Sequence, residues 1–183
     1  NDMASPFYFV MPVPILLHIV FGSLFNLLMP LQFVAKLRQN RPRFHRFLGR
    51  FLVFCALGFS LSALFMNQVY PQYGGIFKYL GIVTYCIVLI GSLTLGIRAI
   101  RQKRIAQHRV WMMRLTAAAL APATQRVIIL PVFAVFGESV INDTVIATLI
   151  WAGLIINLLF VQFVIHKDKP RHQGKSELLS SAS

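Results

Sequence analysis

Residues 108–126 read HRVWMMRLTAAALAPATQR, which places one histidine and three arginines in a stretch that otherwise resembles a membrane-spanning helix. An arginine at the centre of a membrane helix costs about 2.5–3.5 kcal/mol on insertion scales. Each such arginine therefore needs a polar partner or a function. The search for those partners guides the interpretation of the rest of the chain.

The composition is typical of an integral membrane protein. Of the 183 residues, 57% are hydrophobic and 13% are charged, whereas soluble domains carry about 25% charged residues. The net charge of +13 comes from basic residues that cluster between apolar runs, as in the cytoplasmic links of multi-pass membrane proteins. This pattern argues against nucleic-acid binding and favours contact with membrane lipids, above all anionic headgroups at the cytoplasmic face.

Five apolar runs are long enough to cross a bilayer core of about 30 Å, which requires about 20 helical residues. Pro30 predicts a kink in the first run, and Pro122 and Pro131 interrupt the fourth. We predict an all-α fold: a polytopic membrane bundle in one domain, residues 1–166, with a disordered polar tail, residues 167–183. The predicted transmembrane helices cover residues 14–36, 47–68, 76–100, 110–136 and 144–165.

The distribution of lysine and arginine predicts the orientation of the bundle. The links after the first and third runs and the C-terminal tail are rich in basic residues. The other side carries Lys78 beside Asp2, Glu138 and Asp143. By the positive-inside rule, the N-terminus lies outside and the C-terminus lies in the cytoplasm.

Two histidines stand before an arginine at the cytoplasmic start of a span, His45 before the second and His108 before the fourth. Membrane proteins hold b-type haem between histidines of two neighbouring helices, with the propionates bound by arginines at the interface. The pattern predicts one cytoplasmic-side haem, with His45 and His108 as ligands of the iron. The arginines predicted to bind its propionates, or the headgroup of a quinone, are Arg46, Arg50, Arg109 and Arg114.

A second polar layer lies in the outer half of the membrane. His18 lies about 6 Å inside the first span, and Arg126 lies in the outer half of the fourth. We predict that the two form a site for a quinone or another small anionic ligand. The structural alternatives are a helix-packing hydrogen bond at His18, beside Gly22, and bonds from Arg126 to carbonyls freed by the prolines of its span.

None of the five acidic residues lies within a predicted span, so no carboxylate is available there to pair with an arginine. Their absence argues against transport driven by an Asp/Glu proton relay. The sequence also lacks a Gly-x-Ser-x-Gly elbow and an HExxH motif, so hydrolytic chemistry has little support. No enzyme class follows from the sequence.

Several of these residues recur in a spacing that is similar to a known family. They are His18-x3-Gly22, Pro30-x-Gln32-Phe33, Arg38, His45-Arg46-x2-Gly49-Arg50, His108-Arg109-x-Trp111-Met112-x-Arg114 and Arg126. Across residues 18–126 the chain resembles a bacterial family of small predicted membrane proteins, domain of unknown function 2306. Met29 departs from the small residue expected before Pro30. The resemblance implies a helical bundle in the bacterial inner membrane and brings no established activity.

A looser similarity connects the chain to cytochrome b561-like haem bundles, although a second histidine pair is missing. Three functions remain open. The first is electron transfer through a b-type haem or a quinone. The second is a non-catalytic accessory or assembly subunit of a larger membrane complex, and the third is a small transporter or lipid-binding protein. A larger complex or a homo-oligomer would be the protein partner.

Overall fold

The computed structural model describes residues 7–70, 75–137 and 142–180, and every regular element within these ranges is helical. The first elements are α1 (Phe7–Val10), α2 (Pro12–Leu28), the 3₁₀ helix η1 (Met29–Phe33) and α3 (Ala35–Asn40). They are followed by α4 (Pro42–Val69), α5 (Gly75–Arg101), α6 (Ile105–Ala119), α7 (Ala121–Phe136) and α8 (Asp143–Ser180). The predicted all-α fold is confirmed.

Five segments of the described chain are long and apolar enough to cross a membrane. They are Pro12–Phe33, Pro42–Val69, Gly75–Arg101, Ile105–Phe136 and Asp143–Lys167. Each corresponds to one predicted span, so the prediction of a five-span bundle is confirmed. The second and fourth helices begin about one turn earlier than predicted, because polar first turns are not visible as apolar runs. His45 and His108 therefore lie within helices.

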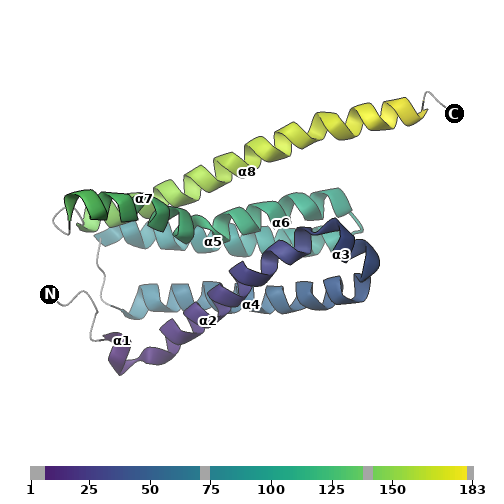
Figure 1. The fold of residues 1–183 in the computed structure, drawn as a ribbon. Helices are drawn as coiled ribbons and strands as arrows, with labels where there is room; N and C mark the ends of the chain where they lie inside the picture. Colours follow the sequence, from purple (N-terminus) through teal and green to yellow (C-terminus); the bar gives the residue numbers. More distant parts are fainter. Residues whose placement is uncertain (1–6, 71–74, 138–141, 181–183) are drawn as a thin grey trace.

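Four helices form the central bundle. α2 packs along α4, α4 along α5, and α5 along α6, which in turn contacts α2. α4 and α6 therefore occupy diagonally opposite corners. α8 packs against α5 and α6 and carries α7 beside it (Figure 1). The first half of the fourth span, α6, is thus part of the four-helix bundle, whereas its second half, α7, packs on α8.

Prolines shape the chain where sequence analysis expected interruptions. Pro30 lies in η1, where the helix tightens before the chain turns into α3. Between α6 and α7 the helix breaks at Leu120, and Pro122 lies in the first turn of α7. Pro131 lies inside α7 without ending it. The break at Leu120 lets α7 leave the line of α6 and pack on α8.

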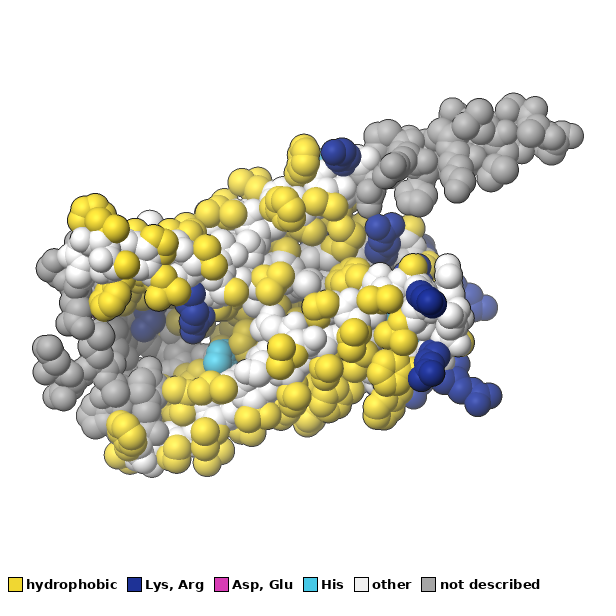
Figure 2. Space-filling view, viewed as in Figure 1, with side chains coloured by type: hydrophobic (Ala, Val, Ile, Leu, Met, Phe, Trp, Pro, Cys, Tyr) yellow, Lys and Arg dark blue, Asp and Glu magenta, His cyan; other side chains and the backbone are white. Residues whose placement is uncertain are grey.

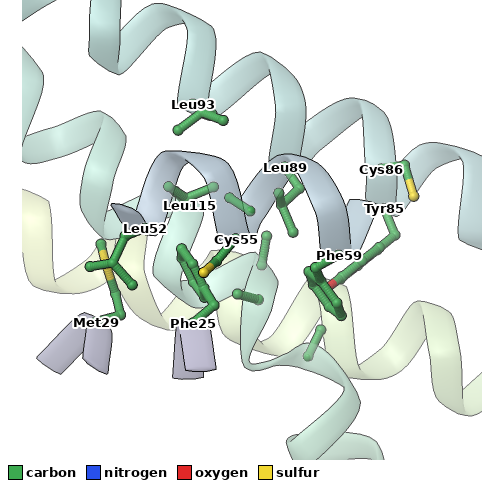
Figure 3. Close-up of a cluster of buried hydrophobic side chains, with 14 of the residues drawn as sticks. Phe25, Met29, Leu52, Cys55, Phe59, Tyr85, Cys86, Leu89, Leu93 and Leu115 are labelled. Carbon is green, nitrogen blue, oxygen red and sulfur yellow. The ribbon is translucent and has the colours of Figure 1, made fainter. Parts of the chain in front are cut away.

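The core lies where the four bundle helices meet (Figure 3). Phe25, Cys55, Leu89 and Leu115, one from each of these helices, are at most 1% exposed. In a membrane such contacts stabilise the bundle mainly by close van der Waals packing, because lipid tails are as apolar as the side chains. This packed centre separates the polar groups of the two halves of the bundle.

Lysine and arginine side chains gather at one end of the molecule (Figure 2). We call it the basic end; it contains α3, the start of α4 and the turn between α5 and α6. The opposite, far end contains the start of α2 and the start of α8. Which end faces the cytoplasm stays a prediction.

α8 extends past the other helices at the basic end (Figure 1). Its backbone is helical to Ser180, although the segment 167–183 was predicted to be disordered. A short polar helix without packing partners is only marginally stable in water. Because the side chains beyond Lys167 lie outside the described residues, the predicted disorder of the tail stays a prediction.

Candidate functional site

His108 lies in the first turn of α6 at the basic end and is half-buried. Its Nδ1 lies 2.9 Å from the carbonyl oxygen of Gly96 in α5. A carbonyl only accepts hydrogen bonds, so Nδ1 carries the hydrogen and Nε2 of the neutral ring keeps a lone pair. This is the usual arrangement of a histidine that binds a metal, because the carbonyl fixes both ring orientation and tautomer.

Gly96 permits this hydrogen bond because it lets α6 lie close to α5. A Cβ atom added at Gly96 would collide with the terminal methyl group of Met112 and lie 3.4 Å from Cβ of Trp111. Both contacts come from α6, within the two turns that follow His108. The small residue at this position therefore helps to place the His108 ring.

His45 lies in the first turn of α4 and is also half-buried. Its Nδ1 is buried and has no hydrogen-bond partner among the described residues. Its main-chain carbonyl accepts a hydrogen bond from Nε2 of Gln32 at 3.3 Å, which ties η1 to the start of α4. An unpaired buried polar atom costs about 1–3 kcal/mol, so the His45 ring needs an explanation.

An electrostatic interaction connects His45 with His108, although their helices lie at opposite corners of the bundle. Arg38 and Arg46 also act electrostatically on the His45 ring. The two histidines therefore share one positively charged region. Their helical phases could not be compared from sequence alone, because each residue rotates the helix face by about 100°.

The predicted arginines divide into two groups. Arg46, Arg50 and Arg109 are exposed at the basic end. Arg114 is half-buried: its Nη2 donates to Oε1 of Gln162 at 3.1 Å, and its guanidinium lies 4.5 Å from the centre of the Trp111 ring. An amide of α8 and an indole thus compensate this charge in the absence of a carboxylate.

His18 lies in α2, in the far half of the bundle. Its Nδ1 lies 3.1 Å from the carbonyl oxygen of Phe59 and 3.3 Å from Oγ of Ser62. Because the Ser62 hydroxyl itself donates to the Phe59 carbonyl at 3.0 Å, Nδ1–H of His18 is the second donor to that oxygen. Nε2 of His18 then keeps its lone pair. The helix-packing hydrogen bond that sequence analysis offered as an alternative is present.

Gly22 lies one turn after His18 and shapes the same contact. A Cβ atom at Gly22 would lie 3.0 Å from Cδ2 of Phe59. The Phe59 ring also packs against the His18 ring, with 4.6 Å between centroids, and meets Tyr85 edge to face. The hydroxyl of Tyr85 is buried and has no hydrogen-bond partner among the described residues.

Arg126, on α7, is exposed and donates from Nη1 to the carbonyl oxygen of Pro122 at 2.9 Å. The expected structural alternative was a carbonyl freed by a proline, and a proline frees the carbonyl four residues before it, so the bond to the carbonyl of Pro122 itself is a different one. Its charge also acts on the His18 ring of α2. Figure 2 shows a hollow between α2 and α7 with histidine and Lys/Arg side chains on its walls.

Four side chains near these sites were not predicted: Arg38, Ser62, Tyr85 and Gln162. Gln162 carried a usable signal, because an amide in a long apolar run usually has a polar partner. Ser62 and Tyr85 carried none, since serine and tyrosine are common in membrane helices and only helix packing places them. Among the described side chains, no group of three or more His, Cys, Asp or Glu is arranged to hold a metal ion.

A family model described as "Predicted membrane protein (DUF2306)" matches residues 15–165. The chain belongs to this family. The match extends beyond residues 18–126, which carried the resemblance, and reaches into all five spans. No curated protein and no solved structure matches the chain. The looser similarity to cytochrome b561-like bundles stays a prediction.

Proposed function

We propose that this protein binds one b-type haem at the basic end, between His45 and His108, and takes part in electron transfer in the membrane. The observation that carries the proposal is the hydrogen bond from Nδ1 of His108 to the Gly96 carbonyl. It orients the ring and leaves Nε2 free to bind iron. His45, which is connected electrostatically with His108 from the diagonal helix, supplies the second ligand.

The residues around the pair fit a haem. The two imidazoles form the ligand set of a b-type haem, and Arg38 and Arg46 place positive charge beside His45, as propionates require. Leu48 and Leu52, one and two turns after His45, are buried and help to exclude water from the bundle interior. A haem held by two histidines would supply one-electron transfer.

The arginines have distinct roles in this proposal. Arg46, Arg50 and Arg109 are the propionate partners that sequence analysis assigned, and Arg38 joins them. Arg114 contacts Gln162 and Trp111, so its main contribution is to hold α6 against α8. Losing Arg114 should therefore weaken the fold before it weakens haem binding.

Haem content in histidine variants tests the proposal. We expect His45→Ala and His108→Ala to lose most of the bound haem, because each histidine supplies one of the two ligands of the iron. The matched control is His166→Ala, an exposed histidine of α8 at the same end, which should keep its haem. Haem is measured by the pyridine haemochromogen assay and folding by circular dichroism. Full haem content in both variants would exclude the pair.

A further inference from the structure

The break at Leu120 opens one side of the bundle. α6 contacts α2, but α7 packs on α8 and has no extensive contact with α2 or α4 within the described chain. Among the described residues, no helix closes the side of the bundle between α2 and α7, and Figure 2 shows a hollow there. Yellow apolar side chains lie on α2 and α7 beside this hollow, on the surface that a five-span bundle turns toward lipid (Figure 2).

Two polar groups of these helices, His18 of α2 and Arg126 of α7, offer complementary hydrogen bonding. Nδ1–H of His18 is committed to the Phe59 carbonyl, so Nε2 of the neutral ring can only accept. The guanidinium of Arg126 has five N–H donors, and the described contact to the Pro122 carbonyl uses one nitrogen. A ligand that bridges them needs one hydroxyl donor and one oxygen acceptor.

The depth of the two residues selects among membrane-soluble ligands. His18 lies six residues after the start of α2, about 9 Å along the axis, and Arg126 lies ten residues before the end of α7, about 15 Å. Phospholipid phosphates stay at the interface, above this level. The Phe59 ring beside His18 adds an aromatic surface on which a planar ring can pack.

We infer that the hollow between α2 and α7 binds a lipid-soluble quinol. One phenolic hydroxyl donates to Nε2 of His18, and the other oxygen accepts from Arg126. The oxidised quinone has no hydroxyl, so it cannot donate to Nε2 and binds more weakly. The inference extends beyond the proposed haem function and does not rest on it, because His18 and Arg126 lie in the far half.

A matched pair of ligands tests the hydroxyl requirement. A decyl-substituted benzoquinol and its dimethyl ether are titrated by calorimetry into protein in phosphatidylcholine nanodiscs, anaerobically with excess dithionite. We expect the quinol to bind at least tenfold more tightly than the ether. Equal binding of the two ligands would overturn the inference. So would displacement of the quinol by equimolar short-chain phosphatidylglycerol, which would identify a site for phosphate.

Variants identify the residues. His18→Phe should abolish the preference for quinol over ether, and Arg126→Gln should weaken quinol binding at least tenfold. The controls are His166→Phe and Arg101→Gln, both exposed and remote from the hollow, which should bind as the native chain does. Unchanged binding in both test variants would exclude the site. The haem ligand variant His108→Ala should keep the preference, which separates this test from that of the haem.

Discussion

At the scale of single residues, the arginines in the fourth span find partners other than carboxylates. Arg114 uses the amide of Gln162, and Arg126 uses the Pro122 carbonyl. Asn157 of α8 also uses a main-chain carbonyl: its Nδ2 donates to the Ala117 carbonyl at 3.0 Å. Amides and main-chain carbonyls therefore compensate most polar groups inside this bundle, as expected where water is absent.

Asn157 should stabilise the joint between α6 and α7. Its Oδ1 accepts from the Thr124 hydroxyl at 2.8 Å while its Nδ2 bonds to α6, so one side chain ties both helices to α8. We expect Asn157→Leu to lower the free energy of unfolding by about 1 kcal/mol, measured by circular dichroism during SDS titration. Asn26→Leu is the control, because the hydrogen bond that the described residues give Asn26 stays within its own helix, to the Gly22 carbonyl.

An equal loss of unfolding free energy in the two asparagine variants would show that the hydrogen bonds of Asn157 to α6 and α7 add no more stability than a bond within one helix. A greater loss in Asn26→Leu would contradict the assignment outright.

For Tyr85 we expect no loss of stability on removal of the polar group. Its hydroxyl oxygen points toward Phe59 (Figure 3) and has no partner among the described residues. Tyr85→Phe removes an unsatisfied group without changing the ring, so the free energy of unfolding should stay equal or rise by about 1 kcal/mol. Thermal denaturation followed by circular dichroism measures the change. A clear loss of stability would mean that the hydroxyl has a bound partner.

Sequence analysis located the unusual residues but not their contacts. His18, His45, His108 and Arg126 were visible because charge and imidazole are rare inside apolar runs. The acceptors of His18 and His108 are main-chain carbonyls, at Phe59 and Gly96, and every residue carries such a carbonyl. Only the packing of α2 on α4 and of α6 on α5 selects which carbonyl is used.

At the scale of elements, the sequence predicted where a helix breaks but not against which helix the following segment packs. Pro122 indicated an interruption of the fourth span, and the break lies at Leu120. Proline fixes its own backbone and removes a hydrogen bond, but it does not choose a new packing partner. The direction of α7 depends on contacts with α8, more than 25 residues later in the chain, at Gly153 and Asn157.

Gly153 should set the spacing between α7 and α8. A Cβ atom there would lie 2.7 Å from the main-chain oxygen of Ala121, which cannot move without shifting α7. We expect Gly153→Ala to destabilise the protein by about 1–3 kcal/mol in SDS titration, as overpacking does. Gly91→Ala is the matched control, since nothing lies within 4 Å of its added Cβ. Equal stability of the two variants would contradict this packing.

At the scale of the whole molecule, the sequence predicted the five-span bundle from apolar length alone. It also predicted two separate polar layers, and electrostatic interactions connect His18 with Arg126 and His45 with His108. The sideways opening between α2 and α7 was not predictable from the sequence, because it arises where α2 and α7 do not pack on each other. The orientation of the bundle depends on charge alone and needs its own test.

Single cysteines test the orientation. The native Cys55 and Cys86 are 0% exposed and should not react, so they need not be removed. In intact cells, a membrane-impermeant maleimide should label Thr144→Cys at the far end but not Gln39→Cys at the basic end, although both positions are exposed. Lysed cells should label both. The reverse pattern in intact cells would place the N-terminus in the cytoplasm.

The optical spectrum of the purified protein tests the central claim most directly. The protein is expressed with ample haem, purified in mild detergent, and measured as isolated and after dithionite reduction. Two histidine ligands predict a Soret band that shifts on reduction and sharp α and β bands, the spectrum of a six-coordinate haem. A featureless spectrum from folded protein would contradict the assignment of His45 and His108 as haem ligands.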